Sequence, residues 1–307
     1  MQQHEDLLLK LVRFESKITG RHGIGALVDN GRVLVDLTTD NSPIKNDMRS
    51  ILANGKQSMK QACDIIATGK GRISVDEVKI LAPIIDPPKV IGVGLNYKDH
   101  ALEAKMAAPS EPVIFTKFSS SIVGPNANII KPKTSDEVDY EVELVIVIGR
   151  EGRSIPESEA LDYVAGYTIG NDVSARDWQL RKPGSQWSLG KSFDTFSPIG
   201  PSIVINPSWA HLGDVHTAPV LDPNNLGINL TLNGKVMQNS NTKEFIFPVQ
   251  QVVSYLSQVF TLTPGDIIFT GTPAGVGFTR SPPIFLQPGD HVTCSIEHLG
   301  SLSNKVV

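Results

Sequence analysis

The sequence predicts an α+β fold that consists mainly of β structure, and three observations support this prediction. Short β-rich runs alternate with turns over much of the chain. The regular alternation of strands and helices that builds a doubly wound sheet is missing. The best helical pattern, residues 249–258, begins after Pro248 and carries an apolar stripe. The predicted strands cover residues 89–93, 113–118, 140–148, 164–169, 228–232, 236–239, 266–270 and 291–296.

The N-terminal part of the chain is predicted to form a small α/β region. Residues 26–35 resemble a hairpin, because an Asn-Gly pair between two apolar runs suits the positive φ angles of a type I′ turn. Residues 46–67 carry apolar side chains at near-helical spacing with one interruption, which predicts two short helices. The proline-containing stretch 82–88 breaks regular structure. We therefore expect an N-terminal region of residues 1–85 and a larger domain of residues 86–307.

Composition excludes several classes of protein. With 40% hydrophobic and 20% charged residues, the 307-residue chain has the composition of a globular protein. A net charge of −4 without a basic cluster argues against nucleic acid and anionic membranes as partners. No apolar run approaches the roughly 20 residues of a membrane-spanning helix. Two cysteines, Cys63 and Cys294, favour an intracellular setting, and residues 1–20 resemble neither a secretory signal nor a transit peptide.

Two glutamates at the start of an apolar run form the most informative motif. Glu141 and Glu143 lie just before the apolar run of residues 144–148. Because side chains alternate across a strand, both glutamates point to the same face. Two like charges at the edge of a core repel each other and resist desolvation unless a cation lies between them. The pair therefore predicts a metal site, although an isolated Glu-x-Glu is more often a solvated strand end.

Asp172 follows the next predicted strand and could add a third carboxylate to this pair. All-oxygen ligands suit hard cations, whereas zinc normally recruits histidine or cysteine. Mg²⁺ or Mn²⁺ is favoured over Ca²⁺, since three ligands leave positions for water and substrate. The alternative is that Asp172 is a turn or cap residue.

A histidine and a glutamate are spaced to meet on one side of a helix. His100 and Glu103 lie three residues apart, so Glu103 could orient the imidazole and make it a general base. Residues 106–109 are small enough to hinge, which suits a lid. A chance ion pair on an exposed helix is the other interpretation.

Two further segments could contact an anionic substrate. Lys191 lies among small and apolar residues, which could keep its ammonium near an anion, although it could equally be an ordinary surface lysine. The glycine-rich stretch 270–277 could bind a carboxylate through its amides and hydroxyls, or it could be a plain tight turn. Nucleotide motifs fail, because Gly92-Val93-Gly94 continues to Tyr97 where a third glycine is needed.

Taken in order, five motifs resemble the fumarylacetoacetate hydrolase family, and the resemblance covers residues 87–307. The motifs are Gly94-Leu95-Asn96-Tyr97 with His100-x-x-Glu103, Glu141-Val142-Glu143, Asp172-x-x-x-Arg176-Asp177, Gly190-Lys191-Ser192-Phe193-Asp194, and Thr270-Gly271-Thr272-Pro273-x-Gly275-Val276-Gly277. A chance match of five ordered motifs is very improbable. The resemblance implies a mixed β-sandwich roll with the active site at one end, a Mg²⁺ or Mn²⁺ ion and a homodimer. It also implies a mitochondrial location, with a cytoplasmic one as the alternative.

The resemblance also assigns roles to nine residues. They are Glu141, Glu143 and Asp172 as metal ligands, His100, Glu103 and Lys191 as catalytic residues, and Arg176, Gln179 and Thr272 as substrate contacts. One position departs from the family pattern. Enzymes that cleave fumarylacetoacetate use an aspartate seven residues before the histidine, and this chain has Val93 there. The resemblance therefore does not extend to cleavage of fumarylacetoacetate itself.

These residues lead to a functional hypothesis centred on small 2-oxo acids. The carboxylate and keto oxygens of such an acid can chelate one metal ion, which stabilises an enolate. We expect an oxaloacetate keto-enol tautomerase. Acylpyruvate hydrolase and oxaloacetate decarboxylase are the alternatives, because the same enolate serves all three reactions. A non-catalytic protein that binds a metal and an organic acid is an alternative of another class.

Overall fold

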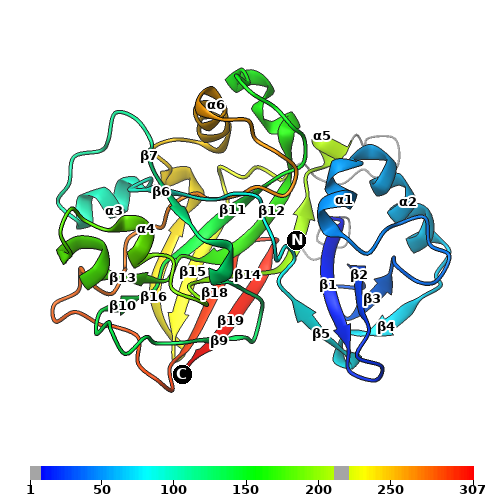
Figure 1. The fold of residues 1–307 in the computed structure, drawn as a ribbon, viewed down its shortest axis with the longest axis horizontal. Coiled ribbons are helices and arrows are strands. Elements are labelled where there is room, and N and C mark those ends of the chain that lie inside the picture. Colours follow the sequence, from blue (N-terminus) through cyan, green and yellow to red (C-terminus); the bar gives the residue numbers. More distant parts are fainter. Residues whose placement is uncertain (1–7, 211–220) are drawn as a thin grey trace.

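The computed structural model of the protein describes residues 8–210 and 221–307, so the first seven residues of the N-terminal stretch 1–20 lie outside the described residues. The predicted α+β fold, mainly β, is confirmed (Figure 1). The strands are β1 (Lys10–Ser16), β2 (His22–Val28), β3 (Val33–Asp36), β4 (Arg72–Ser74), β5 (Val78–Leu81), β6 (Val90–Gly94), β7 (Val113–Lys117), β8 (Ile122–Val123), β9 (Asn128–Ile129), β10 (Val138–Asp139), β11 (Val142–Ile148), β12 (Val164–Asn171), β13 (Ser174–Ala175), β14 (Ser197–Ile205), β15 (Gly227–Leu232), β16 (Lys235–Asn241), β17 (Ile267–Phe269), β18 (His291–Ile296) and β19 (Gly300–Val306). The α-helices are α1 (Met48–Ala53), α2 (Lys56–Ala67), α3 (Lys98–Glu103), α4 (Trp187–Gly190), α5 (Pro207–Ala210) and α6 (Val249–Val259).

Most of these strands belong to two sheets. Among the described residues the larger sheet has twelve strands, ordered β4-β3-β2-β1-β14-β12-β11-β17-β6-β7, with β5 beside β1 and β8 beside β14. The smaller sheet has the order β16-β15-β18-β19-β9, and β10 pairs with β13. Most neighbouring pairs in the larger sheet are antiparallel, but β17 runs parallel to β6. This mixture of directions agrees with the absence of regular strand-helix alternation in the sequence.

The N-terminal region continues the larger sheet, because β1 pairs with β14 in the register Lys10 to Val204. In Figure 1 this region, drawn in blue and cyan, lies beside the main body with α1 and α2 over its strands. The predicted hairpin is confirmed as β2 and β3, and the two predicted helices as α1 and α2. A second Asn-Gly turn, Asn233-Gly234, joins β15 to β16 with φ angles of 52° and 79°.

Strand β11 explains how the central sheet is stabilised, because its alternate residues belong to two different cores. Leu144 and Ile146 belong to the core shared with the smaller sheet. Val145 and Val147 belong to the core that includes residues of α1 and α2. All four side chains are fully buried, so the strand is apolar on both faces and reads as a continuous hydrophobic run. The polar residues that the sequence places at its N-terminal end are thereby held at the end of a central, buried strand.

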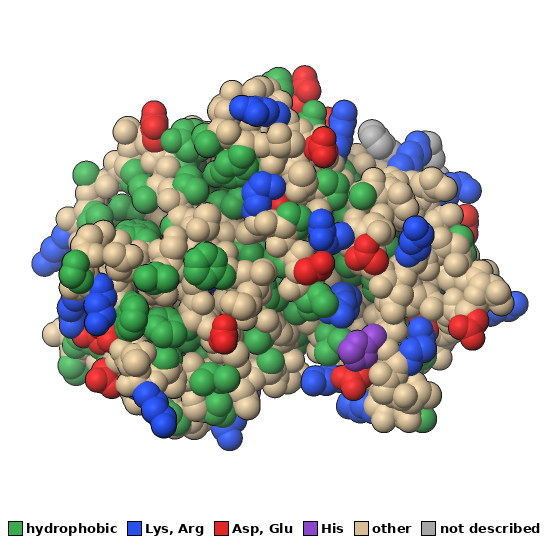
Figure 2. Space-filling model, in the orientation of Figure 1, with side chains coloured by type: hydrophobic (Ala, Val, Ile, Leu, Met, Phe, Trp, Pro, Cys, Tyr) green, Lys and Arg blue, Asp and Glu red, His purple; other side chains and the backbone are tan. Residues whose placement is uncertain are grey.

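The surface of the molecule is not uniform. Figure 2 shows hydrophobic side chains gathered over the half of this face that carries α3, α4 and β7 in Figure 1. Charged side chains of both signs are interspersed over the half formed by the N-terminal region. Across residues 8–210 and 221–307, no helix has the length and apolar character needed to cross a membrane.

Candidate metal centre and active site

The structure brings the three predicted metal ligands together. Glu143 lies in β11, Glu141 immediately precedes this strand, and Asp172 immediately follows the neighbouring strand β12. The Asp172 amide donates a hydrogen bond of 2.8 Å to the Glu141 carbonyl, which holds the two strand ends side by side. One carboxylate oxygen of each residue lies within 4.8 Å of those of the other two, and all three residues are buried.

Two lysines neutralise part of this negative charge. Lys191 Nζ lies 2.7 Å from Glu141 Oε2 and 2.7 Å from Asp172 Oδ2. Lys117 Nζ donates to Asp172 Oδ1 and, at 2.9 Å, to the carbonyl oxygen of Phe196. Both ammonium groups come from segments remote from the carboxylates in the chain. They show that the site is built to hold several buried charges at once.

An arginine completes the arrangement of charges. Arg176 Nε lies 2.9 Å from Asp139 Oδ2, and one of its terminal nitrogens lies 2.5 Å from Glu141 Oε1. Burial opposes ionisation of Glu141, but Lys191 and Arg176 outweigh burial and lower the pKa of Glu141 to about 2. Glu141 is therefore a permanent anion in the folded protein.

Glu143 has the opposite electrostatic environment. Burial, together with the nearby charges of Asp172 and Glu141, raises the pKa of Glu143 well above its ordinary value. The Gly271 amide donates to Glu143 Oε2 at 2.7 Å, which compensates only in part. Four carboxylates, those of Asp139 and the three predicted ligands, lie close together in this cluster. Only three cationic side chains pair with them, those of Lys117, Arg176 and Lys191, so the charges of the described side chains leave one carboxylate uncompensated. A divalent cation fits this donor set, because it would compensate the charge of Glu143.

His100 and Glu103 form the predicted pair on α3. His100 Nδ1 lies 3.2 Å from Glu103 Oε2. Burial alone would raise the pKa of Glu103, but the hydrogen bonds from His100 and from the Gly275 amide lower it. Glu103 is therefore an anion that accepts the Nδ1 proton, which leaves Nε2 of His100 as the basic nitrogen.

All nine predicted site residues line one cavity of about 370 Å³. Its polar lining includes the three carboxylates, Lys191, Thr272, His100 and Glu103. The remaining wall contains apolar side chains, of which the largest belong to Leu95, Met106, Phe115, Leu180, Trp187 and Phe278. The cavity lining therefore combines charged groups with apolar side chains, as small-molecule sites commonly do.

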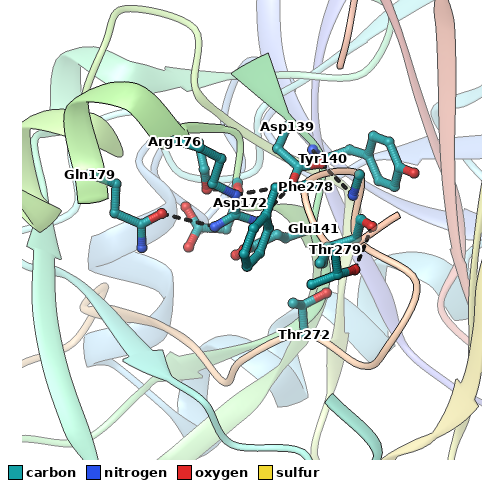
Figure 3. A network of polar contacts seen from close by, with 12 residues as sticks. Asp139, Tyr140, Glu141, Asp172, Arg176, Gln179, Thr272, Phe278 and Thr279 are labelled. Carbon is teal, nitrogen blue, oxygen red and sulfur yellow. Dashed lines mark hydrogen bonds and ion pairs between the residues drawn. The ribbon is translucent and has the colours of Figure 1, made fainter. Parts of the chain in front are cut away.

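The three side chains that were predicted to contact the substrate are positioned by hydrogen bonds within the protein. Figure 3 shows Arg176 between Asp139 and Gln179, and the side-chain oxygen of Gln179 accepts from Arg176 at 2.9 Å. This bond leaves the amide nitrogen of Gln179 as the group that can donate to a ligand. Thr272 Oγ1 donates to the Val142 carbonyl at 2.9 Å and accepts from Gln238 at 2.8 Å.

The glycine-rich stretch 270–277 contacts the carboxylates of the protein itself. Three of its glycine amides donate to carboxylates of the site, Gly271 to Glu143, Gly275 to Glu103 and Gly277 to Asp139. The expectation that these amides serve a substrate carboxylate is therefore wrong for the three amides named. The segment acts as a scaffold that positions the acidic residues of the site.

Sequence reasoning missed Lys117 and Asp139. Phe115 and Lys117 lie two residues apart in β7, so their side chains point to the same face of the strand. Because Phe115 lines the cavity, Lys117 is also directed inward. Asp139 lies two residues before Glu141 and could have been recognised as the second carboxylate that a buried Arg176 requires. The first signal requires knowing that Phe115 is buried, and the second requires knowing that Arg176 is buried.

Comparisons with known proteins identify the family of the chain. Residues 89–307 match the family model described as fumarylacetoacetate (FAA) hydrolase C-terminal. A fumarylacetoacetate hydrolase domain-containing protein 2 homolog from Dictyostelium discoideum is 58% identical over 303 residues, 97% of each chain. The Homo sapiens protein named oxaloacetate tautomerase FAHD2A, mitochondrial, is 43% identical over 300 residues, 97% of this chain and 92% of that protein. The solved fumarylacetoacetate hydrolase from Exiguobacterium antarcticum has a TM-score of 0.82 and 37% identity, and the match covers 97% of this chain and 99% of that one.

Proposed function

The chain belongs to the fumarylacetoacetate hydrolase family, and from this premise we propose that it is a Mg²⁺- or Mn²⁺-dependent oxaloacetate keto-enol tautomerase. The observation that carries the proposal is that three buried carboxylates and a histidine-glutamate pair line the same cavity. Relatives that share more than 40% identity with this chain over nearly its whole length bear the name oxaloacetate tautomerase. Their names also support a mitochondrial location, and we extend the proposal to a homodimer by family likeness.

Glu141, Glu143 and Asp172 would hold the divalent cation. When bound, such a cation polarises the keto group of a 2-oxo acid and stabilises negative charge on its oxygen. Lys191 adds a positive charge beside two of these ligands, at 2.7 Å from each. Its ammonium therefore favours the same developing charge on the substrate oxygen.

The proton transfer falls to His100. Its Nε2 atom accepts a proton from C3 of the bound acid, because Glu103 holds the Nδ1 proton and stabilises the imidazolium that forms. Return of a proton to the oxygen at C2 yields the enol, and the reverse sequence yields the ketone. The amide nitrogen of Gln179 is oriented by Arg176 and donates a hydrogen bond to the substrate carboxylate.

Two alternatives use the same residues. In an acylpyruvate hydrolase, His100 would activate a water molecule instead of removing a proton from carbon, and in a decarboxylase the C4 carboxylate would leave as CO2. The likeness to the solved hydrolase supports the first alternative. Val93, which lines the cavity where the cleaving enzymes need an aspartate, weighs against hydrolysis of fumarylacetoacetate. The His100 and Glu103 pair weighs against a purely binding protein, because binding alone needs no base.

The test follows the ultraviolet absorbance of oxaloacetate enol. We expect the purified protein to accelerate its decay with Mg²⁺ or Mn²⁺, to lose this effect after chelation, and to recover it when the ion is restored. Glu143→Gln should abolish the effect, whereas the matched change Glu159→Gln, at an exposed position outside the cavity, should not. An unchanged decay rate with wild-type protein and either ion would refute the proposal. Release of pyruvate would indicate a decarboxylase, and release of acetate from acetylpyruvate would indicate a hydrolase.

A further inference from the structure

The Gly92-x-Gly94 motif, which fails as a nucleotide site, has a different structural role. Both glycines lie in β6 and, being two residues apart, present the same face. A Cβ atom at Gly92 would lie 2.1 Å from the Phe115 ring, and one at Gly94 would lie 2.7 Å from the Trp187 ring. The absence of side chains at these two positions is therefore what allows both aromatic rings to lie against the strand.

Phe115 and Trp187 form a continuous aromatic wall of the cavity. Their ring centroids are 5.8 Å apart with an interplanar angle of 56°, and both residues line the cavity. Phe115 is 6% exposed, and Trp187 is partly buried. Leu180 and Met106 also line the cavity, so the aromatic pair belongs to an apolar surface that can accept a flat group.

This aromatic wall begins beside the groups proposed to carry out the reaction. Lys191 Nζ lies 5.0 Å from the centroid of the Phe115 ring and also contacts Glu141 and Asp172. Trp187 is one helical turn before Lys191, and its carbonyl accepts from the Lys191 amide at 3.1 Å. A substituent on C3 of an acid bound beside Lys191 is therefore within reach of these aromatic rings.

The chemistry of the wall selects the kind of substituent. The second carboxylate of oxaloacetate can interact with the Lys191 ammonium, which lies against the Phe115 ring, but it gains little contact area from the rings themselves. An aryl group gains contact area and offset or edge-to-face stacking against the two rings. We propose that the site also tautomerises 3-aryl-2-oxo acids, with the aryl ring bound against Phe115 and Trp187. This inference rests on the proposed function, since it assigns a second substrate class to the same site.

The step needs no additional reactant. His100 removes a proton from C3, the electron pair of that C–H bond forms the C2–C3 double bond, and the carbonyl electron pair moves to the oxygen at C2, which gains a proton. No atom is oxidised or reduced, and one proton has moved from carbon to oxygen. Conjugation of the new double bond with the aryl ring favours the enol.

The experiment compares phenylpyruvate with oxaloacetate, each with Mg²⁺, by following enol absorbance. We expect wild-type protein to accelerate tautomerisation of both. Trp187→Ala should lower kcat/KM for phenylpyruvate at least tenfold more than kcat/KM for oxaloacetate. The matched control is Leu189→Ala, on the same helix but 45% exposed and outside the cavity, and it should leave the ratio unchanged. Thermal melting of each variant checks that it is folded.

A binding measurement separates failure of this inference from failure of the proposed function. With Mg²⁺ present, calorimetry should show that wild-type protein binds phenylpyruvate at least tenfold more tightly than pyruvate, and that Trp187→Ala loses this preference. Activity on oxaloacetate without activity on phenylpyruvate would overturn the inference and leave the proposed function intact. Equal losses for both substrates in Trp187→Ala, or equal binding of phenylpyruvate and pyruvate to wild-type protein, would also overturn it.

Discussion

Replacing Arg176 with methionine removes the charge that two buried carboxylates share. Removing one partner of a buried ion pair typically costs about 3–5 kcal/mol, because the other charge is left uncompensated. Asp139 would keep hydrogen bonds from three amides, those of Tyr140, Gly277 and Phe278. Glu141 would keep its contact with Lys191. We therefore expect Arg176→Met to lower the free energy of unfolding by about 3 kcal/mol, the lower end of this range.

A second substitution tests the electrostatic origin of this loss. In the Arg176→Met background, Asp139→Asn removes one of the two uncompensated charges, while an asparagine oxygen can still accept from the Gly277 amide. The double variant should therefore recover about 1 kcal/mol or more, within the usual range for interacting neighbours. Urea unfolding of chelator-treated protein, followed by circular dichroism, measures each free energy. A loss below about 1 kcal/mol in Arg176→Met, or a further loss on adding Asp139→Asn, would refute the reasoning.

Three further predictions concern the metal, the base and the glycine-rich segment. Because the pKa of Glu143 is raised, its contribution to stability is present at low pH and is lost as the pH rises through the folded-state pKa. Mn²⁺ binding favours the ionised form, so thermal stabilisation by Mn²⁺ should increase with pH and should disappear in Glu143→Gln. His100→Asn should lower kcat roughly 10²- to 10⁴-fold with little change in Mn²⁺ affinity, and a comparable loss of affinity would assign it a structural role. Gly277→Ala should destabilise the protein in thermal melts, because its Cβ atom would lie 1.9 Å from the Ile284 carbonyl oxygen and 2.6 Å from Asp139 Oδ1, and an unchanged melting temperature would contradict the close packing.

Local patterns in the sequence were sufficient to find residues that the fold brings to one cavity. Glu141 and Glu143 follow the two-residue period of a strand, and His100 with Glu103 follows the spacing of a helix turn. Each pattern needs only neighbours within a few positions. The meeting of Glu141 and Glu143 with Asp172 follows from the antiparallel pairing of β11 with β12, the next long strand of the larger sheet.

Features that depend on distant contacts could not be derived in this way. The pairing of β1 with β14 joins Leu11 to Ile203, and no local signal indicates that the N-terminal strands extend the main sheet. The contact of Lys117 with Asp172 and that of Gly277 with Asp139 likewise join segments that lie far apart in the chain. Backbone amides have no sequence signature, so the identity of their acceptors appears only when the fold is known.

The glycine-rich segment that donates to Glu143, Glu103 and Asp139 has a consequence for how such a site can change. The proposed metal ligand Glu143, the His100 partner Glu103 and the Arg176 partner Asp139 are all held by one stretch of backbone. A shift of that stretch would displace them together, so substitutions there affect every part of the chemistry. Trp187 lines the cavity from α4, and the three amides named above hold carboxylates and not this residue. Its side chain can therefore be replaced, and the choice of substrate changed, while those three carboxylates keep their positions.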